Sequence, residues 1–128
     1  MKKKIKKERP YPDKTLIKGA LRRLMARSPV IRKVKETAVH PSIRGPRGGK
    51  TYICADCNKT FPGKDIAIDH IKPVVPLTKD LNSMSYDDIV KRIFCPISNL
   101  QPLCKACHKV KTSDERKKRT VYKRRNKK

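Results

Sequence analysis

Residues 99–112, with the sequence NLQPLCKACHKVKT, contain the residue types that decide how this chain folds. Cys104 and Cys107 form a Cys-x-x-Cys pair, and His108 follows directly. On a helix, residues three and four positions apart lie on one side, so His108 would stand next to the cysteines yet could serve a different site. A second pair with the same two-residue gap, Cys54 and Cys57, precedes it, with 46 residues between the two pairs. The spacing predicts that the two pairs meet in space.

Two such pairs complete the tetrahedral shell that zinc prefers. Four protein ligands leave no open coordination position, so the sequence predicts a structural zinc ion. Paired core thiols or a redox couple are the alternatives, but neither explains why both pairs share one spacing. The gap exceeds the usual zinc-ribbon spacing of about 15–20 residues, which predicts a folded insertion between the pairs. The fifth cysteine, Cys95, is expected to be a small buried hydrophobe.

The composition leaves little material for a hydrophobic core and argues for this metal. The chain has 128 residues, of which 36% are apolar and 5% aromatic, and a net charge of +24. Zinc binding, worth roughly 10 kcal/mol or more in small domains, would supply the missing stability. The sequence predicts no membrane span, no secretory signal and no closed disulfide framework, because apolar runs are short and the cysteine count is odd. A reducing, cytoplasmic location is therefore expected.

Charge divides the chain into a near-neutral middle and two basic ends. Residues 1–50 carry +14, residues 51–112 carry +3, and residues 113–128 carry +7. The middle is where a folded, chemically active unit is expected. Residues 1–9 are expected to be a disordered basic tail, and residues 113–128 a second basic tail, with a helical extension as the alternative.

Periodicity and turn residues predict an α+β fold. An N-terminal helical region, residues 10–40, should hold two short helices, the first capped by Asp13 and ending near Arg27, the second starting at Ser28-Pro29. Residues 41–50, rich in proline, glycine and basic residues, are expected to be a mobile linker. The further expected elements are strands at 51–54, 65–69 and 95–98, a loop at 72–81, and helices at 85–94 and 102–112.

Only one further histidine has an informative neighbour. His70 follows Asp69 at the end of an expected strand, whereas His40 precedes a proline in the linker and is assigned no role. A carboxylate with a neutral imidazole can bind one divalent ion and leave positions open for phosphate and water. Taken singly, Asp69 could simply end a strand and Asn99 could cap a helix. Together with the histidines, however, they form an ordered set: Asp69, His70 and Asn99 lie between the two cysteine pairs, and His108 directly follows the second pair.

These motifs resemble those of the zinc-containing HNH endonuclease family over residues 52–112, about half of the chain. The matching stretches are Cys54-x-x-Cys57, Asp69-His70-Ile71-x-Pro73 and Asn99-Leu100-Gln101-Pro102-Leu103-Cys104-x-x-Cys107-His108-x-x-Lys111-Thr112. The resemblance implies a nuclease domain over residues 51–112, with a ββα-metal finger of two strands, a loop and a helix around one divalent ion. Small basic chains of this kind resemble those of phages and mobile elements, which implies the cytoplasm of a bacterial or phage-infected cell.

The resemblance also implies a role for each matched residue. His70 resembles the general base, Asp69 and His108 the ligands of the catalytic metal, and Asn99 the central asparagine that holds the loop and the base. The metal would be Mg²⁺ or Mn²⁺, with Ni²⁺ or Zn²⁺ as alternatives, and the products would carry 5′-phosphate and 3′-hydroxyl ends. The chain departs from the family in the 28 residues between His70 and Asn99, which contain a helix of their own.

The basic charge predicts a polyanionic partner, since lysine and arginine bind phosphate without reading bases. Lys72 and Lys111 beside the candidate site, and Arg22 and Arg23 on the first helix, are the expected phosphate contacts. Few aromatic residues are available for base stacking, which favours duplex DNA over single strands. A protein partner that directs cleavage stays open.

Two readings from other classes compete with the nuclease. A non-catalytic zinc-ribbon protein that binds DNA or RNA would need the four cysteines but not Asp69 or His108. A ribosome-associated basic protein is supported by charge alone.

Overall fold

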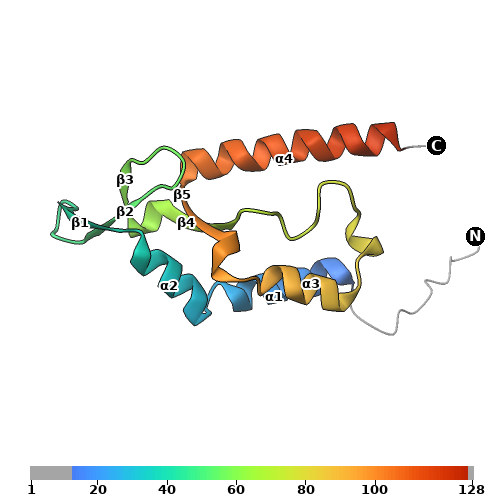
Figure 1. Ribbon diagram of the computed structural model, residues 1–128, viewed down its shortest axis with the longest axis horizontal. Coiled ribbons are helices and arrows are strands. Elements are labelled where there is room, and N and C mark those ends of the chain that lie inside the picture. The colour runs from blue at the N-terminus through green and yellow to red at the C-terminus, as the bar shows by residue number, and fades with distance from the viewer. Residues whose placement is uncertain (1–12, 127–128) are drawn as a thin grey trace, which may run out of the picture.

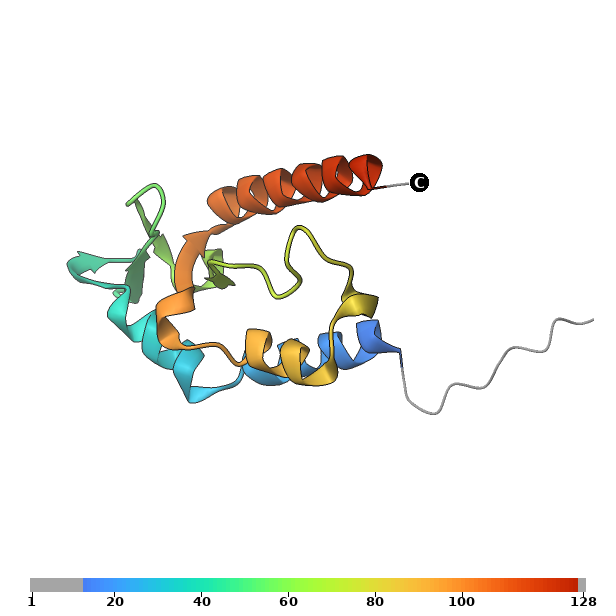
Figure 2. The ribbon, with the colours of Figure 1, turned by 45° about the vertical axis from the view of Figure 1, so that its right-hand side comes forward.

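Four helices and two small antiparallel sheets form an α+β structure over residues 13–126, the part of the chain that the computed structural model describes. Figure 1 shows α4 along one side of the molecule and α1 and α3 along the opposite side, with the sheets at one end. The connection that follows β4 runs between these two sides, as the turned view in Figure 2 also shows. The tail expected at residues 1–9 lies outside the described residues.

The two short helices expected near the N-terminus are present, although Val39 and His40, also expected in this helical region, belong to strand β1 (Val39–Arg44). Helix α1 (Lys14–Met25) begins after Asp13, whose carboxylate accepts a hydrogen bond from the backbone N–H of Thr15 at 2.8 Å. Helix α2 (Pro29–Thr37) follows Ser28, with its proline in the first turn, where a missing N–H costs nothing. Met25 and Val34 are the buried residues of the two helices.

The predicted linker at residues 41–50 is wrong, because most of this segment belongs to a β-hairpin. Strand β1 (Val39–Arg44) pairs antiparallel with β2 (Lys50–Ile53), which pairs in turn with β3 (Thr60–Pro62). Gly48, with φ of 74°, allows the chain to reverse between β1 and β2. Glycine and proline mark tight hairpin turns as well as linkers, so composition alone could not separate the two.

The second sheet consists of β4 (Ile66–His70) and β5 (Leu100–Cys104), antiparallel, with Asp69 opposite Gln101. The strand expected at 65–69 is confirmed. The strand expected at 95–98 is wrong: Ile97–Asn99 form a single 3₁₀ turn, and β5 starts after it. Pro102 lies within β5, which a sheet of only two strands tolerates because both strands are edges.

Helix α4 (Lys105–Arg125) starts three residues later than expected and continues well beyond residue 112. Its N-terminus is delayed because β5 extends through Cys104, which is also the N-cap of α4. The basic segment after residue 112 is helical up to Arg125, so the alternative of a helical extension describes it. Helix α4 packs against both β4 and β5.

The insertion between β4 and β5 supplies much of the main core. It contains a loop, as expected for residues 72–81, a 3₁₀ turn (Leu81–Ser83) and helix α3 (Tyr86–Ile93), which Ser85 caps as expected. Helix α3 packs against α1. The buried residues of this core are Met25, Val34, Val74, Met84, Ile89, Ile93, Cys95 and Leu100. Cys95 is thus a buried apolar residue, as predicted.

Replacing Ile89 by alanine tests the contribution of the insertion to stability. Ile89 is 0% exposed, so Ile89→Ala should lower the free energy of unfolding by about 2–5 kcal/mol. Its neighbour Val90 is 42% exposed, and Val90→Ala should change the free energy by only about 0.5 kcal/mol. Urea denaturation of the zinc-loaded protein measures both. Equal effects of the two substitutions would contradict the packing described above.

Candidate functional site

Four cysteines from two distant segments meet at one point. Their sulfur atoms all lie within 4.8 Å of one another, and Cys57 Sγ is 4.0 Å from Cys104 Sγ. Sulfur atoms bound to one zinc ion at about 2.3 Å in tetrahedral geometry are about 3.8 Å apart. Cys54 and Cys104 are buried, while Cys57 and Cys107 are partly exposed. The cluster could therefore hold a structural zinc ion, as the two Cys-x-x-Cys pairs predict.

Local backbone geometry aims the cysteines at this point. The turn after β2 carries Cys54 and Cys57, and it closes with Asn58 in the left-handed conformation at φ of 59°. Asparagine adopts this conformation more readily than most residues. On the other side, the backbone N–H of Cys107 donates to Cys104 Sγ, and that of Cys104 donates to Cys54 Sγ, both at 3.4 Å. Backbone donors directed at sulfur favour thiolates.

The cysteines differ in how readily they lose a proton. Burial acts to raise the pKa of Cys54, but N–H donors of Cys104, Cys57 and Asp56 outweigh it and lower the pKa to about 6. The pKa of Cys107 is raised, chiefly by its hydrogen bond with Cys104 and then by burial. Cysteines bind a metal ion as thiolates, so their protons must leave. A divalent cation would replace those protons, which is how zinc binding becomes coupled to pH.

One turn into α4, His108 faces Asp69 on β4. Asp69 Oδ1 and His108 Nε2 are 3.6 Å apart, and their side chains are 14% and 44% exposed. Two ligand atoms at about 2.1 Å from one ion lie roughly 3.0–3.5 Å apart in octahedral or tetrahedral geometry. The separation of 3.6 Å is slightly above this range, and the two residues could supply two ligands to a divalent cation after a small approach of their side chains.

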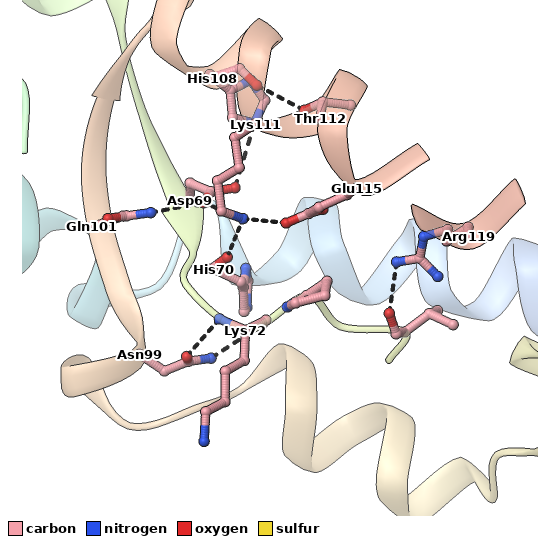
Figure 3. A network of polar contacts seen from close by, with 12 residues as sticks. Asp69, His70, Lys72, Asn99, Gln101, His108, Lys111, Thr112, Glu115 and Arg119 are labelled. Atoms are coloured by element: carbon pink, nitrogen blue, oxygen red, sulfur yellow. Dashed lines mark hydrogen bonds and ion pairs between the residues drawn. The ribbon is translucent and has the colours of Figure 1, made fainter. Parts of the chain in front are cut away.

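The second oxygen of Asp69 is fixed by a network of hydrogen bonds and ion pairs. Two members of this network, Gln101 and Glu115, were not predicted as site residues. Lys111 Nζ lies 2.9 Å from Asp69 Oδ2 and also contacts the carboxylate of Glu115 and the backbone oxygen of His70. Gln101 Nε2 donates to Asp69 Oδ2 at 3.2 Å. Figure 3 shows this network between β4, β5 and α4. Burial lowers the pKa of Lys111, but its hydrogen bonds to Glu115 and Asp69 outweigh burial and raise it.

His70 is oriented by the end of helix α3. Its Nε2 lies 2.9 Å from the backbone oxygen of Ile93. A carbonyl oxygen only accepts, so Nε2 carries the hydrogen and Nδ1 of the neutral ring is left with a lone pair. The hydrogen bond therefore favours the tautomer in which Nδ1 can accept a proton.

Asn99 fixes the chain just after His70. Its Oδ1 accepts from the backbone N–H of Lys72 at 2.9 Å, and its Nδ2 lies 3.4 Å from the backbone oxygen of the same residue. The backbone oxygen of Asn99 accepts from Ile71 N–H at 2.8 Å. The side chain of Lys72 points away from the network around Asp69 (Figure 3). The side chain of Asn99 therefore holds the backbone of Lys72, two residues after His70, in place.

A groove of about 530 Å³ collects most of the predicted site residues. Asp69, His70, His108 and Lys111 line it at one end, and Arg22 lines it from α1. Asn99 and Lys72 border a separate hollow, together with Lys91 and Arg92. The guanidinium of Arg23 lies close to Gly19 on its own helix, and Arg23 is not part of the groove lining. Lys111 is close to the site as predicted, but two carboxylates already occupy its ammonium group.

Comparison of the chain with protein-family models, with curated proteins and with solved structures finds no significant match in any of the three. Over residues 13–126, no helix combines the length and apolar character needed to span a bilayer.

Removal of one cysteine tests the zinc site. The wild-type chain should contain one zinc ion, and Cys104→Ala should lose it, together with helical circular dichroism, because Cys104 joins β5 to α4. Cys95→Ala, which removes a buried thiol outside the cluster, should keep one zinc ion per chain. Plasma mass spectrometry measures the metal content. Zinc retained in full by Cys104→Ala would contradict this assignment.

Proposed function

We propose that this chain is a metal-dependent endonuclease of the HNH type that hydrolyses DNA phosphodiester bonds. The observation that carries the proposal is the convergence of Asp69, His70 and His108 on one groove, with a carboxylate oxygen and an imidazole nitrogen 3.6 Å apart. The order of the elements supports the proposal, because the antiparallel strands β4 and β5 and then helix α4 have the same order as the two strands and the helix of a ββα-metal finger. The cysteine cluster at the β5–α4 junction would stabilise this unit.

In the proposed reaction His70 acts as the general base. Its Nε2–H is held by the backbone oxygen of Ile93, so Nδ1 is the atom that can take a proton from the attacking water. Histidine suits this task because its imidazole gains and loses a proton near neutral pH. Asn99 keeps the backbone after His70 in place through its two contacts to Lys72, which fits the positioning role that the family resemblance implies.

Asp69 and His108 would hold the catalytic divalent cation, Mg²⁺ or Mn²⁺ first among the candidates. When bound, such an ion supplies charge stabilisation to the phosphate and to the departing 3′ oxygen. The chain's own contribution is to fix its ligands: Lys111 and Gln101 engage Asp69 Oδ2 and leave Oδ1 facing His108. Glu115 in turn holds Lys111, so the position of the carboxylate depends on a chain of three charged groups.

A non-catalytic zinc-ribbon protein that binds nucleic acid is the competing proposal. The cysteine cluster and the net charge of +24 would serve such a protein equally well. It gives no reason for Asp69, His70 and His108 to converge. The two experiments below separate the proposals.

Substitution of His70 tests the base. His70→Ala should lower the rate of supercoiled-plasmid relaxation in Mg²⁺ or Mn²⁺ by at least about 100-fold, the usual contribution of a general base. Binding of duplex DNA should be unchanged, because the substitution removes no cationic side chain of the groove. His40→Ala is the matched control, since His40 lies on β1 and does not line the groove. Relaxation at the wild-type rate by His70→Ala would remove the assigned role.

Substitution of Asp69 tests the metal pair. Asp69→Asn should weaken Mn²⁺ binding to the zinc-loaded protein, measured by calorimetry, by about tenfold or more and slow relaxation in parallel. Asp65→Asn is the control, because Asp65 lies just before the same strand and pairs with Lys105 instead. The zinc-ribbon proposal predicts that both variants behave like the wild type. Equal Mn²⁺ binding by all three proteins would favour that proposal.

A further inference from the structure

The groove extends well beyond the candidate hydrolytic centre and changes character along its length. Asp69, His108 and Lys111 line one end, and Glu115 follows one turn later on α4. Further along, the lining residues come from α1, the loop after β4 and the C-terminal half of α4. Figure 1 shows where these elements lie. The cationic side chains of this second part are Lys18, Arg22, Lys79, Arg116, Arg119 and Lys123. Asp80 is the carboxylate that lines the same part.

Among the described residues, no carboxylate forms an ion pair with these cations. Within residues 13–126, the ion pairs at the groove join Lys111 to Asp69 and Glu115, and none involves the cations of the second part. Arg119 donates to the backbone oxygens of Val75 and Pro76, which keeps its charge at the groove wall (Figure 3). The positive charge of this part is therefore available to an anionic ligand.

Cations from two different helices face one another across the groove. The pKa of Lys18 on α1 is lowered, first by burial and then by the positive charges of Arg22 and Arg119. Arg119 belongs to α4, so the repulsion acts between helices far apart in the sequence. Like charges that line one groove favour an anion between them, because an anion removes the repulsion.

The length of the cationic wall fits a polymer rather than a single phosphate. From Arg116 to Lys123, α4 rises by about 10 Å at 1.5 Å per residue. One strand of duplex DNA carries a phosphate about every 3.4 Å along the helix axis, so this wall spans about three phosphates of a duplex whose axis runs along it. From His108 at the candidate centre to Lys123, α4 rises by about 22 Å, which is the length of the whole path.

We propose that the groove between α1 and the C-terminal half of α4 binds the phosphodiester backbone of one strand of duplex DNA, on one side of the bond to be cut. Lys18, Arg22, Arg116 and Lys123 are the phosphate contacts, and Arg119 both contacts phosphate and fixes the loop. This inference rests on the proposed function for the choice of DNA as ligand. It adds an asymmetric substrate path that leads to the candidate centre.

A pair of charge-matched variants of α4 tests this path. The double variant Arg116→Ala with Lys123→Ala removes two groove-lining charges, whereas Lys117→Ala with Arg124→Ala removes two exposed charges from outside the lining. Each variant loses two positive charges, so the two have equal net charge, and each replaces exposed helical residues by alanine. Binding of a labelled 20-base-pair duplex is measured by fluorescence anisotropy over a range of salt concentrations, without added Mg²⁺ or Mn²⁺.

The groove variant should bind about tenfold more weakly, or worse, at 0.1 M salt, and its salt slope should fall by about 1.8, the value for two lost phosphate contacts. The control variant should stay within about 0.5 of the wild-type slope, because exposed charges far from the phosphates are screened. Arg22→Ala and Arg23→Ala provide the same comparison on α1, because Arg22 lines the groove and Arg23 does not. Thermal melting verifies that all variants are folded.

Equal losses of duplex affinity by the groove and control variants would overturn the proposal. Such a result would show that binding depends on net charge and not on which face of α4 carries it. An effect confined to a single-stranded oligonucleotide, with duplex binding unchanged, would overturn the choice of duplex DNA. Because no catalytic metal is present, this experiment is independent of cleavage. Face-specific binding in a protein that cleaves nothing would refute the proposed endonuclease and leave the DNA path supported.

Discussion

The arrangement of the candidate site depends on the junction between β5 and α4, where Cys104 meets the turn after β2. Cys104 ends the strand, caps the helix and belongs to the four-cysteine cluster. The helix direction set there determines whether His108, one turn later, reaches Asp69 on β4. The second core cluster, Cys54, Ile66, Leu103 and Cys104, is half thiol, so apolar packing alone gives this junction little stability. A zinc ion bound by the four sulfurs would make the junction rigid.

Lys111, on the second turn of α4, compensates the negative charge of Asp69. Asp69 is mostly buried, and an ionised carboxylate in such a place requires positive charge and hydrogen-bond donors. Lys111 and Gln101 satisfy one oxygen, and the other is left toward His108. Glu115 balances the charge of Lys111 one helical turn away. The carboxylate is thus partly neutralised but keeps one oxygen for a further cation, which is the property that a metal ligand needs.

Sequence patterns identified the residues of local motifs and failed where partners are set by long-range pairing. The Cys-x-x-Cys spacing predicted the cluster, and the caps at Asp13 and Ser85 predicted their helices. Gln101 could not be found, because only the register of β4 against β5 places it opposite Asp69. Glu115 did leave a signal, since it lies four residues after Lys111 on a helix. That signal was hidden among the many charges of the basic segment.

The insertion between His70 and Asn99 is part of the site rather than an addition to it. Ile93 is the last residue of α3, and its backbone oxygen is one of the carbonyls that a helix leaves without an internal partner. His70 donates to that oxygen. In the proposed reaction His70 becomes a cation after taking a proton, and the negative end of the α3 dipole would stabilise that cation. Arg92, bonded to the backbone oxygens of Pro73 and Val74, ties this helix end to the loop that follows His70. The segment that departs most from the family pattern therefore supports the residue on which the proposed chemistry depends.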